Sequence, residues 1–141
     1  MNKKYNLIVV LLVVLSMPIL AQHTTDNGGG EKTEVKQKMP QFPGGDVAFY
    51  DFLDKNVQLP LGFDKEKYLN EHHNQFVPVS VGFTVDTDGS IINIKVIDGD
   101  DENLNTKAKE IVKKMPKWEP GYQNGSPVQV EFAIPIRFNL M

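Results

Sequence analysis

The segment VPVSVGFTVDTDGSIINIKV, residues 77–96, decides the fold. From Val77 to Val85 the odd positions hold four valines and a phenylalanine, while the even positions hold proline, serine, glycine and threonine. This period of two predicts a β-strand with one buried face. The stretch DTDGS then supplies turn residues, among which Gly89 tolerates positive φ. The apolar face continues on a return strand, so the segment predicts a β-hairpin, with the return strand burying Ile92, Ile94 and Val96.

The final segment, VQVEFAIPIRFNL at 128–140, alternates even more regularly. One apolar and one polar face predict an antiparallel sheet that is covered on a single side. A helix between the return strand and the final strand forms a crossover, so these two strands should run parallel with the first strand between them. The predicted order 2-1-3 places the final strand on an edge. Pro135 agrees, because proline in a strand is tolerated mainly on an edge or at a bulge.

The cover of this three-stranded antiparallel or mixed sheet is predicted to consist of two helices on one face, which gives a two-layer α+β fold. Residues 104–115 carry one helical stripe and Pro116 ends it, with acidic residues before the stripe and lysines at its end, as the helix dipole favours. A shorter helix is expected at 46–56, with Phe49, Phe52 and Leu53 on one side, and the polar connector at 61–75 leaves room for one more short helix. The stripe consists of Leu104, Ala108, Ile111, Val112 and Met115.

The chain has 141 residues, 40% of them apolar, a formal net charge of −3 and no cysteine. This length suits one domain with some additional chain. Without cysteine, disulfides, thiolate metal sites and thiol catalysis are excluded, and the negative charge argues against nucleic-acid binding.

The amino-terminal stretch at 7–21 is a nearly continuous apolar run interrupted by Pro18. It is shorter than the ~20 residues of a membrane span but suits the core of a signal peptide. We therefore expect residues 1–21 to be a cleaved signal peptide that directs the protein to the periplasm, with an uncleaved inner-membrane anchor as the alternative. Because no cysteine follows the cut, a bacterial lipoprotein is excluded. Residues 22–38 contain a single aliphatic side chain, Val35, and predict a flexible linker before the folded residues 39–141.

Candidate catalytic and metal-binding groups do not assemble into a site. His72 and His73 are adjacent rather than spaced i, i+4, and the acidic run at 98–102 lacks the glycine of an EF-hand loop, which favours a helix cap instead. No serine lies in a nucleophile elbow. The sequence predicts neither an enzyme nor a metal, cofactor or small-molecule site.

The segments MPQFPGG at 39–45 and MPKWEPG at 115–121 carry a family resemblance, together with NGSPV at 124–128 and the proline motif at 135–138. With the hairpin they resemble the carboxyl-terminal domain of the TonB family, in the form found in Bacteroidetes-type envelope proteins, over residues 39–140. Here the domain would stand alone behind a signal peptide. The second segment is interpreted as a structural motif, in which the only tryptophan fills the core between helix and sheet, and its members are Pro116, Trp118, Pro120 and Gly121.

The resemblance implies a periplasmic protein-binding domain that supports TonB-dependent transmembrane transport. A short segment of an outer-membrane transporter, the TonB box, would add as a strand beside the last strand of the sheet. Alternatives are a short inner-membrane-anchored energy transducer, or a cell-wall or structural module that uses the lysine-rich helix. The same edge is also a candidate homodimer contact. Carried onto this chain, the implied partner-binding residues are Val128, Gln129, Val130, Glu131, Phe132, Ala133, Ile134 and Arg137.

Overall fold

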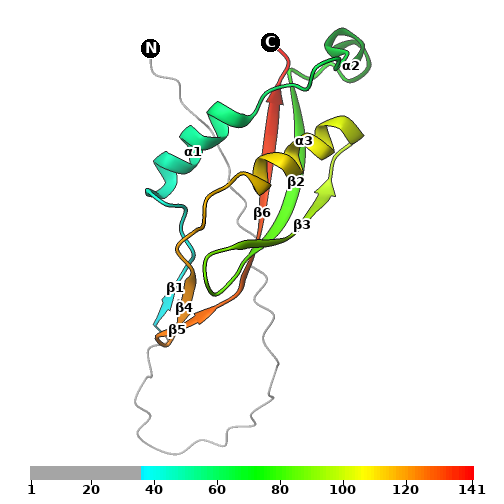
Figure 1. The fold of residues 1–141 in the computed structure, drawn as a ribbon. Helices are drawn as coiled ribbons and strands as arrows, with labels where there is room; N and C mark the ends of the chain where they lie inside the picture. Colours follow the sequence, from blue (N-terminus) through cyan, green and yellow to red (C-terminus); the bar gives the residue numbers. More distant parts are fainter. Residues whose placement is uncertain (1–35) are drawn as a thin grey trace, which may run out of the picture.

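The computed structural model describes residues 36–141, so the predicted signal peptide and most of the predicted linker lie outside the described residues. Three helices and six strands make an α+β fold (Figure 1). In chain order they are β1 (Gln37–Lys38), α1 (Gly45–Asn56), α2 (Lys65–His72), β2 (Phe76–Val85), β3 (Ile91–Asp98), α3 (Glu102–Lys113), β4 (Gly121–Gln123), β5 (Ser126–Val128) and β6 (Val130–Asn139).

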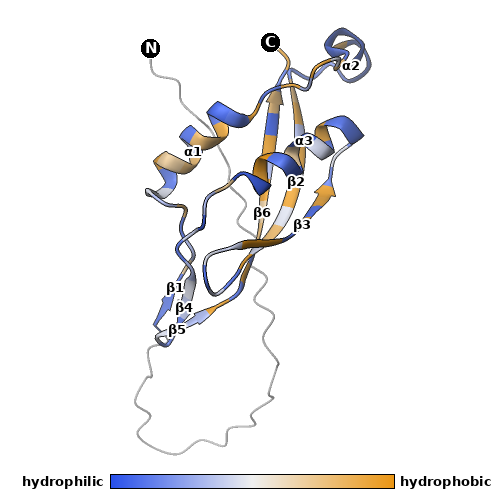
Figure 2. Cartoon of the chain, viewed as in Figure 1, coloured by the Kyte–Doolittle hydropathy of each residue, from blue (hydrophilic) through white to orange (hydrophobic). Residues whose placement is uncertain are grey.

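The main sheet has the strand order β3-β2-β6. β2 pairs antiparallel with both neighbours, so β3 and β6 run parallel to each other on the two edges. This is the predicted order 2-1-3, with the final strand on an edge. Alternating apolar and polar residues are visible along β2 and β6 (Figure 2). The apolar side chains of this alternation are buried from Val77 to Val85 in β2 and from Val130 to Leu140 along β6 and the residue after it.

The core lies between the main sheet and the helices α1 and α3. All five residues of the predicted stripe are buried; four lie in α3, and Met115 follows the end of this helix. The Asp101 side chain caps α3 by accepting a hydrogen bond from the Leu104 N–H at 2.9 Å. Phe49, Phe52 and Leu53 of α1 are partly buried and pack against the same core, as predicted. α1 itself has no fully buried residue, which leaves much of its surface available.

The prediction of two helices was wrong, because α2 forms in the connector between α1 and β2. Its amino end is capped by the Asp64 side chain, which accepts from the Lys67 N–H at 2.9 Å. Tyr68 is its only buried residue. A short polar helix with one anchor produces almost no hydrophobic periodicity, so the sequence left room for this helix without specifying it.

A second, small sheet was not predicted; its strand order is β1-β4-β5. Gln37 and Lys38, assigned to the linker, pair with Gln123 and Tyr122 of β4. Such pairing uses backbone groups and needs no apolar side chain, so the pattern that predicted a linker did not reveal it.

The predicted final strand is divided at Gln129. Val128 belongs to β5 and pairs with Gly121 of β4, whereas β6 begins at Val130. The β4–β5 hairpin turns through Asn124 and Gly125, which adopt φ of 50° and 82°. The hydrophobic alternation continues across the division because both strands follow the same pleat.

The return strand β3 contains a bulge that changes its buried face. Thr84 pairs with Ile92 and Gly82 pairs with Lys95, so β3 has one residue more than β2 in this interval. Asn93 adopts a φ of 54°. The extra residue shifts the side-chain phase, and Ile91 packs against the core in place of the predicted Ile92, together with Ile94 and Val96.

The structure also bears on how the domain relates to a membrane. Within residues 36–141, no helix has both the length and the apolar character needed to cross a bilayer.

Candidate functional site

The outer edge of β6 is the first component of the candidate site. Among the described residues, β2 is the only strand paired with β6 in the main sheet. The register places Pro135 opposite Ser80 and Arg137 opposite Pro78. Proline has no N–H to exchange, so these are the non-hydrogen-bonded pairs of the antiparallel ladder. The Leu140 N–H donates to the Gln75 carbonyl at 2.9 Å, as this phase requires.

The phase of the ladder decides which backbone groups face outward. Even-numbered residues of β6 bond to β2, and odd-numbered residues direct their N–H and C=O groups toward the free edge. Pro135 interrupts the row of donors but keeps its carbonyl. The outward amide donors therefore belong to Glu131, Ala133, Arg137 and Asn139.

The predicted partner-binding residues divide into groups with different surroundings. Glu131, Ala133 and Arg137 lie on the outward phase of β6. Val130, Phe132 and Ile134 have buried side chains, 5–7% exposed, and backbone groups bonded to β2. Val128 lies in β5, and Gln129 lies between the two strands and donates through Nε2 to Asp86 Oδ1 at 2.9 Å. The structure therefore brings three of the eight onto the free edge.

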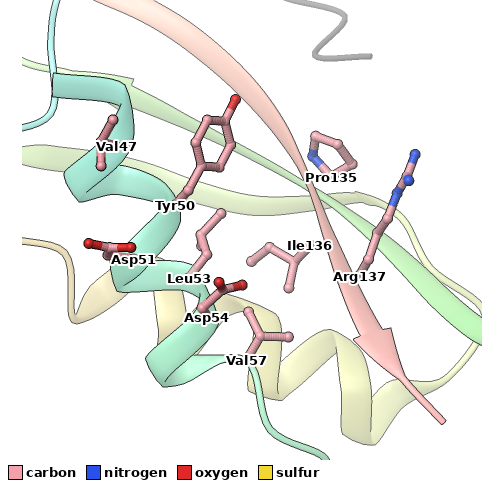
Figure 3. A pocket seen from close by; sticks show the side chains of 9 residues that line it. All are labelled: Val47, Tyr50, Asp51, Leu53, Asp54, Val57, Pro135, Ile136 and Arg137. Carbon is pink, nitrogen blue, oxygen red and sulfur yellow. The ribbon is translucent and has the colours of Figure 1, made fainter. Parts of the chain in front are cut away.

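A groove of about 620 Å³ lies between α1 and β6 and is the second component of the site. In Figure 3, Ile136 points toward Leu53 and Val57 of α1, while Pro135 and Arg137 point away from this helix. The groove is mainly apolar, with carboxylates on the helix wall. Its lining residues are Val47, Tyr50, Asp51, Leu53, Asp54, Val57, Pro135, Ile136 and Arg137.

The helix wall of the groove was missed in the sequence. Val47 and Tyr50 remain 75% and 38% exposed, respectively. With Asp51 and Asp54 they follow the spacing i, i+3, i+4, i+7, which is a second stripe on the helix beside the one that packs on the core. Two apolar residues outside the core-facing stripe were the available signal.

The tryptophan motif positions α1 beside β6. Trp118 is 8% exposed, and its ring centroid lies 5.7 Å from that of Phe49 in α1 and 5.4 Å from that of Phe132 in β6. It therefore fills the core between helix and sheet, as predicted from the sequence. Within the same motif, the Glu119 and Gln41 backbones exchange hydrogen bonds of 2.8 and 3.0 Å, which ties the segment before α1 to the motif.

Gly121 allows the chain to pass closely at the end of this motif. A Cβ atom there would lie 2.9 Å from Val130 Cγ2 and 3.1 Å from Pro40 Cδ. Pro116 and Pro120 lie on either side of Trp118; each has a fixed φ and restricts the backbone of the residue before it, Met115 and Glu119 respectively. The motif thus connects the entry segment, the helix end and the start of β6, and so helps to set the spacing between α1 and the edge.

Two carboxylates hold the β2–β3 turn against neighbouring segments. Asp88 Oδ2 accepts from Lys117 Nζ at 2.8 Å, and Ser90 donates to the same carboxylate; these bonds hold the pKa of Asp88 well below its ordinary value. The hydrogen bond from Gln129, followed by that from the Thr87 N–H, lowers the pKa of Asp86. Both groups are charged hydrogen-bond acceptors at neutral pH and serve to join the turn to Lys117 and Gln129.

The two adjacent histidines lie at the end of α2, where His73 caps the helix with a φ of 55°. His72 ends α2 and stacks on Tyr68 with 4.0 Å between ring centroids. In the part of the chain that the structure describes, no three His, Cys, Asp or Glu residues gather into a group that could hold a metal ion.

The free edge of β6 and the groove between α1 and β6 lie side by side. This arrangement is suited to holding an extended polypeptide.

Comparison with known proteins identifies the family of this fold. Residues 72–140 match the model of the Gram-negative bacterial TonB protein C-terminal family, whereas no curated protein and no solved structure gives a match. The matched range includes β2, β3, α3 and β6, and therefore the whole main sheet. Domains of this family mediate protein interactions, bind outer-membrane transporters in general, and are periplasmic or associated with the cell envelope. Residues 72–140 of this chain form a TonB C-terminal domain.

Proposed function

We propose that this domain binds the TonB box of an outer-membrane transporter as an additional strand on the free edge of β6, and that it thereby supports TonB-dependent transport. The observation that carries the proposal is the register of β6. It directs the backbone groups of the odd residues from Glu131 to Asn139 toward an edge that no described strand occupies.

Strand addition supplies affinity and specificity from different parts of the site. Main-chain hydrogen bonds to the outward donors and carbonyls provide affinity whatever the partner's sequence. Side chains of the incoming strand alternate between two faces. One face lies toward the groove beside Ile136 and α1, and the other lies beside Glu131 and Arg137.

The same edge carries features that limit unwanted pairing. Pro135 removes one donor, and the charged side chains of Glu131 and Arg137 lie on either side of it. Proline and charges on an edge strand disfavour aggregation through that edge. A partner that forms bonds on both sides of Pro135 is therefore favoured over indiscriminate strand pairing.

Hydrogen exchange at single amides tests the proposal. Synthetic amino-terminal segments of candidate outer-membrane transporters, added to the purified protein, should slow exchange at Glu131, Ala133, Arg137 and Asn139. The amides of the even residues, which already bond to β2, should change little. Protection that is equal at odd and even positions, or absent from β6 with every segment, contradicts strand addition.

A matched pair of peptides sharpens this test. N-methylation removes one amide donor from the peptide backbone without changing its side chains. In a binding segment, methyl groups at alternate positions that face β6 should abolish binding, while the same modification at the intervening positions should leave it nearly unchanged. Equal effects at both sets of positions would argue for docking through side chains alone.

We also propose that residues 1–21 direct the protein to the periplasm as a signal peptide, which is then cleaved after Ala21. The support for this is the length of the apolar run at 7–21 and its small residue before the cut. Mass spectrometry of the exported protein should show a mature chain beginning at Gln22. A mass that retains residues 1–21 would instead support the membrane-anchored transducer.

A further inference from the structure

The acidic wall of the α1–β6 groove bears on which segments the site accepts. Val47, Tyr50, Asp51 and Asp54 form the stripe of α1 that lines the groove. The first two present exposed apolar surface. The Asp54 carboxylate lies on the side of α1 that faces Ile136, whereas the Asp51 carboxylate points away from β6 (Figure 3). The groove therefore combines an apolar floor with one carboxylate that faces it, from Asp54, and a second carboxylate on the outer side of the same helix, from Asp51.

These carboxylates have no cation of their own in the described structure. Among residues 36–141, neither Asp51 nor Asp54 takes part in an ion pair or a side-chain hydrogen bond. Arg137 lines the opposite side of the groove, but its side chain points away from α1 (Figure 3). An incoming cation would meet the unneutralised charge of Asp54 in the groove, with the charge of Asp51 farther away on the same helix, and an incoming carboxylate would be repelled by both.

The spacing of the helix stripe matches the spacing of side chains along a strand. Tyr50 and Asp54 are one helical turn apart, a rise of about 6 Å. Residues i and i+2 of a strand share a face and lie about 6.7 Å apart. Where a strand added to β6 runs alongside α1, two successive side chains of one face would therefore meet an apolar and an acidic part of the helix.

We infer that the groove selects an extended segment of another protein that carries, on the face toward α1, an apolar side chain and a lysine or arginine two residues away. This inference rests on the proposed strand addition and adds the chemistry of the partner. The chain's own linker lacks the pattern, because its single aliphatic residue, Val35, has Thr33 and Gln37 two residues away.

Three synthetic peptides test the inference with the full mature protein. They share one β-forming sequence and differ only in the α1-facing core, which is Ile-Thr-Lys, Ile-Thr-Gln or Ile-Thr-Glu. At low ionic strength the lysine peptide should bind about tenfold more tightly than the glutamate peptide, with the glutamine peptide between them. This difference should shrink in 1 M salt, where charges are screened.

Variants of α1 assign the preference to the groove. Asp51→Asn with Asp54→Asn should remove the discrimination among the peptides, and Asp51→Lys with Asp54→Lys should reverse it. Glu66→Lys with Glu71→Lys is the matched control, because it changes the net charge equally on α2, away from the groove. This control should keep the preference for the lysine peptide. If the double lysine variant of α1 does not fold, the double asparagine variant still tests the inference.

The outcomes separate the inference from the function on which it rests. If the peptides protect the odd amides of β6 but bind equally well, the charge selection is wrong and strand addition stands. If the α2 control loses the preference as fully as the α1 variant, net charge and not the groove is responsible, and the inference fails. If no peptide protects β6, or if sedimentation shows that a second copy of the chain occupies the edge, both are overturned.

Discussion

The backbone N–H of Trp118 donates to the carbonyl oxygen of Gly89 at 2.9 Å, which joins the segment after α3 to the β2–β3 turn. Lys117 and Asp88, their immediate neighbours, form an ion pair of 2.8 Å. The Trp118 ring lies against Phe49 of α1 and Phe132 of β6. One short segment therefore connects the turn, the core and both walls of the candidate docking groove.

Gly89→Ala should destabilise the domain strongly. Gly89 has a φ of 86°, and a Cβ there would collide with the Trp118 carbonyl oxygen. Gly62 has nearly the same φ, 83°, with no atom near the position of a Cβ, so Gly62→Ala is a matched control. We expect Gly62→Ala to lower the free energy of unfolding by about 1 kcal/mol, because of the left-handed backbone alone. Gly89→Ala should lower it by about 3 kcal/mol. Urea unfolding measures both; equal losses would show that the contact with Trp118 contributes nothing.

Asp88→Asn should destabilise the domain in a pH-dependent manner. Because Lys117 and Ser90 hold the pKa of Asp88 below its ordinary value of 3.8, this group's contribution is fully present above about pH 4 and is lost progressively as pH falls below that. The gap in urea midpoint between wild type and Asp88→Asn should be largest at pH 7 and should shrink toward pH 2. It should also shrink in 1 M salt, because the pair is exposed.

The control for this experiment is Glu71→Gln, which removes an exposed ion pair with Lys67 of 4.0 Å. Its effect on the urea midpoint should be small at every pH. A gap for Asp88→Asn that stays constant from pH 7 to pH 2 would show that the carboxylate charge does not stabilise the turn.

Trp118→Leu should lower both stability and peptide binding. Shortening this buried side chain leaves a cavity between Phe49, Phe83 and Phe132 and should cost about 2–4 kcal/mol. Trp118 does not line the groove, so weaker peptide binding by the folded variant would come from altered placement of the walls that it supports, α1 and β6. Circular dichroism should follow unfolding, since this variant has no tryptophan. Unchanged affinity in the folded variant would show that α1 is held by its other contacts.

Pro135→Ala should strengthen strand addition to β6. The substitution adds an N–H to the outward row, and one hydrogen bond contributes about 1 kcal/mol, or roughly fivefold in affinity. More self-association at high protein concentration is also expected. Pro78→Ala is the control, because its new N–H would face away from β6, beyond Ser80, which is the first residue of β2 paired with β3. Tighter binding by the control would place the docking segment elsewhere.

The main sheet could be predicted from the sequence because its signals are strong and local. Alternation from Val77 to Val85 and from Val130 to Leu140 specifies which faces are buried. One helical crossover and Pro135 then leave few arrangements of three strands. The family motifs added the identity of the domain and the expectation that Trp118 is buried.

The small sheet and the bulge in β3 carry weaker signals. Gln37 and Lys38 pair through backbone groups alone, and the side-chain shift from Ile92 to Ile91 depends on the positive φ of Asn93. Such features are fixed by the hydrogen bonds of a neighbouring chain segment. The hydrophobic pattern of a single segment therefore cannot predict them.

The sequence by itself determined the fold class, the order of the main sheet, the edge position of β6 and the family resemblance, because periodicity and glycine–proline chemistry act over short stretches. Only the tertiary structure decided which amides of β6 face outward and that α1 forms an acidic wall beside them. Those properties depend on the pairing of Pro78 with Arg137 and on packing between α1 and Trp118. Both are relationships between residues far apart in the chain, which no local pattern records.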